Sequence, residues 1–271
     1  MSSVETTLIT GGGAGIGLEM ARLLAARGHR LVLASRAGPR LRAVAEQLRG
    51  RHGVEVHVHA IDLSAPGAAQ RLFDATEGAG LRIDALVNNA GFGVVDEHVA
   101  IDPDVMHRML QLDVVAVAEL CLHFGRAMKR RGAGRILNVA STAAFQPTPY
   151  FAAYGAAKAF VLNFSEALAK EMEDHGVRVS CLAPGPTDTA FFDSVDPQRI
   201  AGDHHFGKAA RAQATDVAAA GVDLLLGQGL LRVVGWTNRL MVLSNRFVPR
   251  SLVATVSKRL LRPLDLRAGK A

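Results

Sequence analysis

A serine, a tyrosine and a lysine occur at a spacing that suits proton transfer. Tyr154 and Lys158 are four residues apart, so they share one face of a predicted helix. A free tyrosine has a pKa of about 10 and exchanges protons poorly at neutral pH, whereas a nearby ammonium favours its phenolate form. Ser141 ends a predicted strand and could hydrogen-bond the same substrate oxygen. We therefore expect Tyr154 to be a general acid or base whose pKa is lowered by Lys158.

A glycine-rich segment, Thr10-Gly-Gly-Gly-Ala-Gly-Ile-Gly17, lies between a predicted strand at residues 6–10 and a predicted helix at 16–27. Glycines let the backbone turn and approach a pyrophosphate, and a helix N-terminus offers unpaired N–H groups. This context predicts a dinucleotide site, and a glycine turn without a ligand is the alternative. The expected contacts here are Gly11, Gly13, Gly15, Ile16 and Gly17.

The rest of the chain alternates between strand-like and helical segments. Further strands are predicted at residues 31–35, 54–61, 83–88, 135–140, 177–183 and 232–236. Helical patterns lie near residues 39–49, 66–76, 102–130, 152–175 and 215–226, and residues 185–214 are predicted as a loop that closes over a ligand. Repeated strand–helix units with apolar strands predict an α/β fold, a Rossmann-type doubly wound parallel sheet flanked by helices.

Four motifs in this order resemble those of the short-chain dehydrogenase/reductase family, in its compact single-domain branch. They are the glycine segment from Thr10, the Asn88-Asn-Ala-Gly91 segment, the Ser141…Tyr154-x-x-x-Lys158 set and the Pro184-Gly-x-x-x-Thr189 segment. The resemblance spans about residues 4–236. It implies an oxidoreductase that interconverts a carbonyl and an alcohol by hydride transfer with a nicotinamide cofactor, with Tyr154 as the acid or base.

The end of the second predicted strand bears on which nicotinamide cofactor is used. NAD-dependent relatives carry an acid there that bonds the ribose hydroxyls, whereas this chain has Ser35 followed by Arg36. Ser35 cannot repel a 2′-phosphate, and Arg36 could hold it in a bidentate pair, with Arg40 as a second cation. The resemblance therefore implies NADP(H), and an NAD-dependent alcohol dehydrogenase is the alternative.

The resemblance implies further cofactor contacts along the same edge of the sheet. Asp62 would bond the adenine amino group with Leu63 beside it, although Asp62 could also cap the following helix. Lys158 would bond the nicotinamide ribose, and Thr187 and Thr189 would meet the carboxamide and pyrophosphate. The remaining implied contacts are Asn89, Ala90, Gly91, Tyr154, Pro184 and Gly185.

Asp113 stands where these relatives usually carry an asparagine in the helix before the fifth strand. In the family that asparagine helps a water chain to connect the lysine with solvent. An ionised aspartate accepts the same hydrogen bonds but donates none. We therefore include Asp113 among the catalytic residues and expect it to raise the pKa of Lys158 or to tune proton return.

The composition excludes several classes of protein. The 271 residues are 49% hydrophobic, so the chain can bury a sizeable core. Two cysteines cannot build a disulfide framework, and the first residues do not follow a secretory-signal pattern, so we expect a cytoplasmic protein. The histidines have no Cys or carboxylate partners at ligand spacing, so we expect no metal site. No apolar run approaches the ~20 residues that span a membrane.

Positive charge is concentrated at the C-terminal end. The net charge is +6, but residues 227–271 carry +8, which leaves −2 on the first 226 residues. Two helices are predicted here, at residues 238–248 and 250–261. We therefore divide the chain into a catalytic domain, 1–236, and a basic amphipathic helical extension, 237–271. The extension is expected to cover the domain or a second subunit, and a weak contact with an anionic membrane surface is the alternative. No aromatic platform or reading helix favours nucleic acid.

The substrate and the assembly are predicted only in outline. Seven residues could form an apolar wall for a hydrophobic ketone or acyl substrate, and core packing is the alternative: Phe145, Pro147, Tyr150, Phe151, Phe191, Phe192 and Phe206. Reduction is the expected direction in a cytosol that is rich in NADPH. The resemblance implies a homodimer or homotetramer, paired through the helices that contain Asp113 and Tyr154. A non-enzymatic, cofactor-binding sensor or scaffold is the alternative function.

Overall fold

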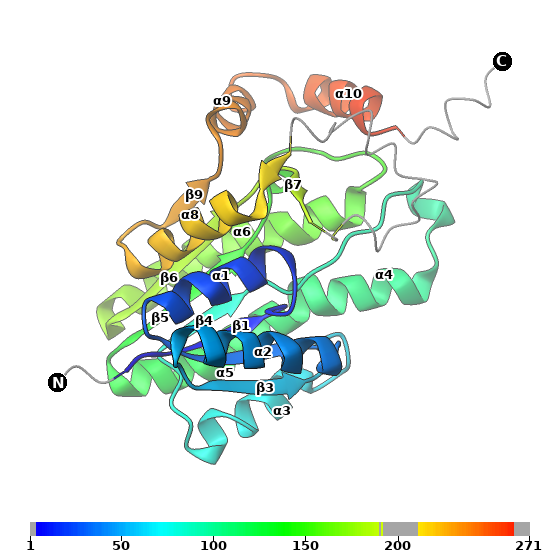
Figure 1. The fold of residues 1–271 in the computed structure, drawn as a ribbon. Helices are drawn as coiled ribbons and strands as arrows, with labels where there is room; N and C mark the ends of the chain where they lie inside the picture. The colour runs from blue at the N-terminus through cyan, green and yellow to red at the C-terminus, as the bar shows by residue number, and fades with distance from the viewer. Residues whose placement is uncertain (1–3, 190, 192–210, 263–271) are drawn as a thin grey trace.

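The computed structural model describes residues 4–189, 191 and 211–262. Seven strands form one sheet in the order β3-β2-β1-β4-β5-β6-β9, and every neighbouring pair is parallel (Figure 1). The strands are β1 (Thr6–Thr10), β2 (Arg30–Ser35), β3 (Val56–Ala60), β4 (Ala85–Asn88), β5 (Gly134–Val139), β6 (Val177–Ala183) and β9 (Leu231–Val233). This strand order confirms the predicted doubly wound sheet.

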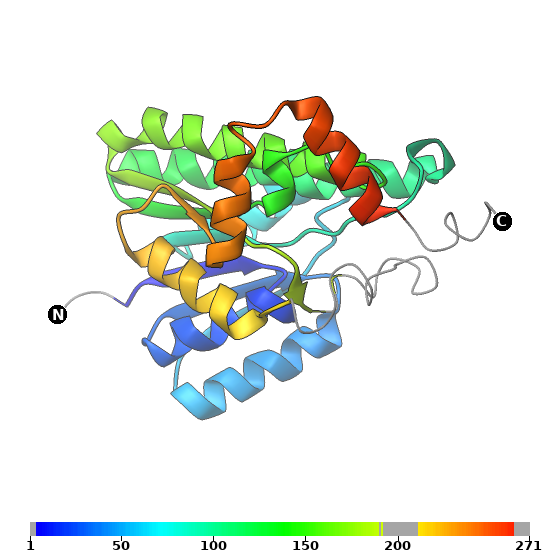
Figure 2. The ribbon, with the colours of Figure 1, turned by 90° about the horizontal axis from the view of Figure 1, so that it is seen from above.

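Helices cover both faces of the sheet, and each face has its own apolar core. The helices α1 (Gly15–Ala26), α2 (Gly38–His52) and α8 (Ala214–Leu226) pack on one face. The helices α3 (Ala68–Asp74), α5 (Ala116–Arg131) and α6 (Ala152–Met172) pack on the other (Figures 1 and 2). Successive strand residues enter opposite cores, as Leu8 and Ile9 of β1 do. The continuous apolar strands of the sequence follow from this double coverage.

The long helix predicted within residues 102–130 is present, and the structure divides this helical stretch into three parts. The helix α4 (Pro103–Leu110) leads into a π-helical turn, η3 (Gln111–Val115), before α5 begins. A π-turn accommodates one residue more than an α-turn and often occurs at functional sites. Here it contains Asp113, whose side chain is fully buried.

The C-terminal part differs from the prediction at its element boundaries. β9 ends at Val233, because the chain turns at Gly235, which has a φ of +88°. The helix α9 (Trp236–Ser244) starts and ends earlier than predicted, and α10 (Arg250–Leu261) matches its prediction. Most of the predicted loop at 185–214 lies outside the described residues, but the short strands β7 (Thr187–Asp188) and β8 (Ala212–Gln213) pair at its two ends. The division at residue 236 stays a prediction.

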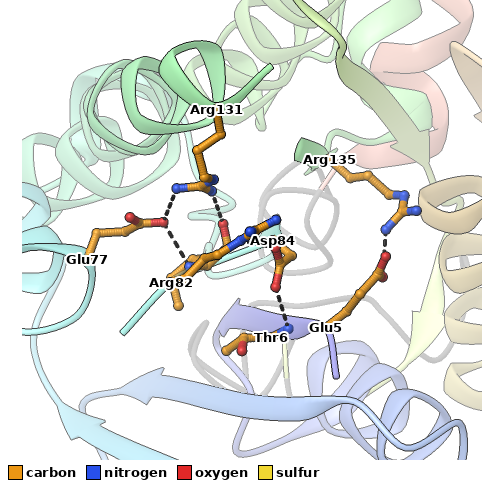
Figure 3. A network of polar contacts seen from close by, with 8 residues as sticks. Glu5, Thr6, Glu77, Arg82, Asp84, Arg131 and Arg135 are labelled. Atoms are coloured by element: carbon orange, nitrogen blue, oxygen red, sulfur yellow. Dashed lines mark hydrogen bonds and ion pairs between the residues drawn. The ribbon is translucent and has the colours of Figure 1, made fainter. Parts of the chain in front are cut away.

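A polar network connects three strands at the amino edge of the sheet (Figure 3). Arg131 at the end of α5 pairs with Glu77 at 2.7 Å, and Glu77 also accepts the backbone N–H of Ile83. Asp84 accepts the N–H of Thr6 at the start of β1. A further ion pair, Arg135 with Glu5, lies at 2.6 Å between β5 and the residue before β1. These contacts hold the edge opposite to the predicted site.

Candidate active site

The three predicted catalytic side chains come together where β5 meets α6. Ser141 follows β5 directly, and Tyr154 and Lys158 lie in the first two turns of α6. Tyr154 is 7% exposed and Lys158 is 5% exposed, so both groups are shielded from water. The Lys158 ammonium lies 5.5 Å from the centroid of the Tyr154 ring. This arrangement follows from the four-residue spacing on one helix face.

Two phenylalanines flank the Tyr154 ring. Phe151 stacks on it with ring centroids 4.2 Å apart, and Phe191 is tilted against it at 5.5 Å. A Cβ atom on Gly93 would lie only 2.5 Å from the ring of Phe151, so this place requires glycine. Phe145 instead packs against the buried core, and Phe192 and Phe206 lie outside the described residues. Two of the seven predicted wall residues are thus in ring contact with Tyr154.

Asp113 forms a buried ion pair with Lys158. Its Oδ2 atom lies 3.2 Å from the Lys158 Nζ atom, and its Oδ1 atom accepts the N–H of Phe92 at 3.1 Å. Burial raises the pKa of the Asp113 carboxyl, and Lys158 and the N–H of Phe92 counteract part of this increase. Lys158 also donates to the carbonyl oxygen of Val139 at 3.3 Å. A Cβ atom on Gly91 would lie 2.9 Å from Asp113 and 3.1 Å from Lys158, so a side chain at 91 would collide with the pair.

The ion pair changes the electrostatics that the sequence predicts for Tyr154. Burial raises the pKa of the Tyr154 phenol above its ordinary value; Lys158 and Ser141 lower it, and Asp113 adds to the increase. For Lys158, burial acts to lower the pKa, but the charges of Asp113 and Tyr154 outweigh it and raise the pKa. The net direction for Tyr154 is therefore opposite to our expectation, because the sequence argument omitted burial and the Asp113 carboxylate.

A cleft of about 340 Å³ opens at the carboxyl ends of the strands beside these residues. Twelve predicted cofactor residues line it: Gly11, Gly13, Gly15, Ile16, Ser35, Arg36, Asp62, Leu63, Asn89, Ala90, Gly91 and Thr189. Sequence reasoning did not assign Ala14, Ala34, Ala37, Ile61, Phe92 and Leu112, which line it too. Phe92 and Leu112 directly adjoin predicted residues, so their positions in the sequence were a usable signal.

The glycine segment is shaped for a close approach to a ligand. Gly11 and Gly15 have φ values of +69° and +52°, which favour glycine. The helix α1 begins at Gly15, and its N-cap residue, Ala14, provides no side-chain cap. The first N–H groups of α1 are thus left without a side-chain acceptor beside the cleft. Gly17 has a packing role, because a Cβ atom there would lie 2.5 Å from Gly11 and Asn89.

Arg36 and Arg40 line the cleft next to Ser35 at the end of β2. Within the described part of the chain, no ion pair engages either arginine. Asp62 also lines the cleft, and its Oδ1 atom accepts the N–H and the hydroxyl of Ser64. Asp62 therefore closes a local turn and does not cap α3, whose N-cap residue is Gly67. Burial opposes the ionised form of Asp62, but Ser64 and the two nearby arginines, Arg36 and Arg108, lower its pKa.

The predicted residues after β6 are divided between two places. Thr189 lines the cleft, and its side chain lies close to Gly15, where an added Cβ atom would be 3.1 Å from it. Pro184 accepts a hydrogen bond from the Thr142 N–H, and the Thr187 hydroxyl donates to the carbonyl oxygen of Gly185, outside the cleft lining. Gly185 lies against a side chain of α9. Across the described residues, no group of three or more His, Cys, Asp or Glu side chains could hold a metal ion.

Known proteins are similar to this chain in sequence and in architecture. A family model described as short chain dehydrogenase matches residues 5–200. The chain is 33% identical to the 7beta-hydroxysteroid dehydrogenase of Collinsella aerofaciens over 187 residues, 68% of this chain and 70% of that protein. It is 32% identical to sulfoacetaldehyde reductase 2 of Chromohalobacter salexigens over 245 residues, 89% of this chain and 95% of that protein. A solved short-chain dehydrogenase from Sphingobium yanoikuyae in complex with NADPH matches with a TM-score of 0.78 and 28% identity, over 90% of this chain and 93% of that one.

The match extends over the elements that build the site. The family model spans the glycine segment, Asp113, Ser141, Tyr154 and Lys158. The structural match extends further, because it includes nine tenths of the chain. The sequence motifs, the strand order and these two matches agree, and the chain belongs to the short-chain dehydrogenase/reductase family of oxidoreductases, which act on alcohol and carbonyl groups.

Proposed function

We propose that this protein is an NADP(H)-dependent reductase of a hydrophobic ketone or acyl carbonyl. The observation that carries the cofactor assignment is the pair Ser35–Arg36 in the cleft at the end of β2, where no acid opposes a 2′-phosphate. Arg40 adds a second cation to the same wall. The NADPH complex of the related Sphingobium yanoikuyae enzyme supports this choice.

The residues present fit a dinucleotide. The glycine segment gives a backbone surface without side chains, and the uncapped N-terminus of α1 suits a pyrophosphate. Asn89 and Gly91, which follow β4, line the part of the cleft between this segment and the catalytic residues, and Asp62 lines the part beyond β2. NADPH, when bound, supplies the hydride, so the protein has to position the substrate and deliver a proton.

Tyr154 is the proton donor in this proposal. Its raised pKa keeps the phenol protonated at neutral pH, which is the form that can protonate a carbonyl oxygen during reduction. The Ser141 hydroxyl, which faces Tyr154, would hydrogen-bond the same oxygen and orient it. Lys158 holds a positive charge near the phenol and would also bond the cofactor ribose.

Asp113 acts as a positioning residue through Lys158. Its carboxylate offsets the ammonium charge that would otherwise favour the phenolate of Tyr154. The pair thereby favours reduction over oxidation, because only reduction needs the protonated phenol at the start. An asparagine at this position would hold Lys158 by a hydrogen bond without cancelling its charge.

The substrate assignment depends on the aromatic surroundings of Tyr154. Phe151 and Phe191 flank the phenol, and Leu112 and Phe92 line the adjoining cleft. An apolar carbonyl compound would bury its surface against these rings. The related hydroxysteroid dehydrogenase supports an apolar substrate, whereas the related sulfoacetaldehyde reductase does not.

We also propose a homodimer or homotetramer. Leu122 on α5 is 47% exposed and Phe160 on α6 is 39% exposed, and the Phe160 ring stacks on Phe164. Exposed apolar side chains on neighbouring helices are typical of subunit interfaces. Light scattering of the purified chain is expected to give two or four copies, and a monomer at all concentrations would contradict this.

The cofactor preference tests the proposed function directly. Wild-type protein is expected to reduce hydrophobic ketones with NADPH. In the Arg36→Asp variant, kcat/KM for NADPH should decrease by about tenfold or more, and kcat/KM for NADH should be unchanged or higher. Arg51→Asp, on the exposed end of α2, is the matched control and should change neither value. A wild-type preference for NADH would contradict the NADP(H) assignment, and bound NADPH without turnover of any carbonyl would favour the scaffold alternative.

A further inference from the structure

The C-terminal helix pair presents an apolar stripe that nothing in the described structure covers. Trp236, Leu240 and Leu243 recur along α9 at intervals of four and three residues, so they lie on one side of the helix, and Phe247 follows in the next turn. Trp236 is 73% exposed and Phe247 is 81% exposed. On α10, three more exposed side chains, Leu252, Val256 and Leu260, follow at intervals of four residues.

The opposite side of α9 is already occupied by the catalytic domain. Asn245 donates to the side chain of Gln146 at 2.9 Å, in the segment after β5. Asn238 donates to the carbonyl oxygen of Val234 and lies against Gly185, which follows β6. α9 is thus fixed at the edge of the sheet that carries the site (Figures 1 and 2), and the side chains of its apolar stripe are exposed.

Charge is strongly biased around this stripe. Residues 236–262 contain six arginine and lysine residues and no acid. The basic residues are Arg239, Arg246, Arg250, Lys258, Arg259 and Arg262. In α9 and the turn after it, Arg239 and Arg246 lie on the flank of the stripe, as in helices that rest on anionic lipid. Two copies of so basic a face would repel each other, which argues against a second copy of this chain as the occupant.

We propose that α9 and α10 form a docking surface for an anionic lipid membrane, with the protein lying on the bilayer rather than crossing it. The apolar stripe would enter the region of the acyl chains, and the arginines would meet the lipid phosphates. Tryptophan favours this interface because one end of its ring is apolar and the other polar. In the described parts of the chain, no helix is long and apolar enough to cross a membrane.

The single tryptophan makes the test simple, because Trp236 lies on the stripe itself. The full chain is mixed with vesicles of phosphatidylcholine alone or of phosphatidylcholine with phosphatidylglycerol. We expect a blue shift of the Trp236 emission and co-sedimentation only with the anionic vesicles, both weakened by salt. Two double variants test the surface, one with Leu243→Ser and Phe247→Ser and the other with Arg239→Gln and Arg246→Gln. Each should reduce the partition coefficient for anionic vesicles by about tenfold.

Val99→Ser and Lys170→Gln are matched controls, because both residues are exposed and lie outside α9, α10 and the proposed subunit interface. The proposal would be overturned if the control variants weakened vesicle binding as much as the stripe variants do. So would the absence of any shift with anionic vesicles, or equal binding to both kinds of vesicle. If the wild-type protein does not bind lipid and forms a dimer that Leu243→Ser dissociates, the stripe would instead contact a second copy of the chain. None of these results depends on the proposed reaction, because the readout is binding.

Discussion

Two ion pairs lie at opposite edges of the sheet and have different surroundings. Arg131 and Glu77 pair at 2.7 Å at the amino edge, with 19% and 12% of their side chains exposed (Figure 3). Lys158 and Asp113 pair at 3.2 Å at the carboxyl edge, with 6% and 0% exposed. The remaining partners of the first pair are backbone groups of Ile83. The second pair lies beside a tyrosine that can exchange a proton.

This difference shows that the same kind of interaction can serve two purposes. At the amino edge, the pair and its hydrogen bonds to Ile83 fix the end of α5 to the segment just before β4. At the carboxyl edge, the negative charge reduces the influence of Lys158 on Tyr154, so the pair sets a protonation state. Removing the first pair should therefore change stability, and removing the second should change pH dependence.

Tyr154→Phe should have the largest effect. It removes the hydroxyl that we propose as the proton donor and keeps the ring that stacks on Phe151. We expect kcat/KM for reduction to decrease by about 10²- to 10⁴-fold, with thermal stability and NADPH binding close to wild type. Steady-state kinetics, calorimetry and NADPH fluorescence titration measure these quantities. Activity within a few-fold of wild type would show that another group supplies the proton.

Glu77→Gln should have a smaller effect, on a different property. The variant leaves the Arg131 guanidinium half-buried without its carboxylate. We expect the free energy of unfolding to decrease by about 1–3 kcal/mol, measured by urea denaturation. The pH dependence of reduction should be that of the wild type, because Glu77 lies at the other edge of the sheet. A shifted pH profile in this variant would contradict the division between the two edges.

Several features of the fold and site could be predicted from the sequence because they depend on local patterns. Strands buried on both faces give continuous apolar runs, and Gly11, Asn89 and Ser141 follow strand ends, which meet at one edge of a parallel sheet. These patterns located the cleft and twelve of the residues that line it.

Other features depend on contacts between distant segments and were missed. The π-turn around Asp113 interrupts a pattern that is helical throughout. The pKa of Lys158 is raised by Asp113, as the sequence suggests, but the effect of this carboxylate on Tyr154 was not predicted. The direction of the Tyr154 pKa depends on burial, which the spacing of residues does not report. Gly17 matches a cofactor motif, but the structure places it against Asn89. A glycine can be required by packing or by a ligand, and the sequence does not distinguish the two.

The most direct test of the account is the pH dependence of Asp113→Asn. Asparagine keeps the size of the side chain and removes the negative charge, so the pKa of Tyr154 should become lower. Reduction needs the protonated phenol and oxidation needs the phenolate. Both the loss of reduction and the onset of oxidation with rising pH should therefore move to lower pH than in wild type.

The measurement is kcat/KM against pH in both directions, for wild type, Asp113→Asn and the control Glu77→Gln. We predict that only Asp113→Asn moves the two profiles, and that both move towards lower pH. Profiles for Asp113→Asn that coincide with wild type, or that move towards higher pH, would contradict the claim that the Asp113 carboxylate keeps Tyr154 protonated.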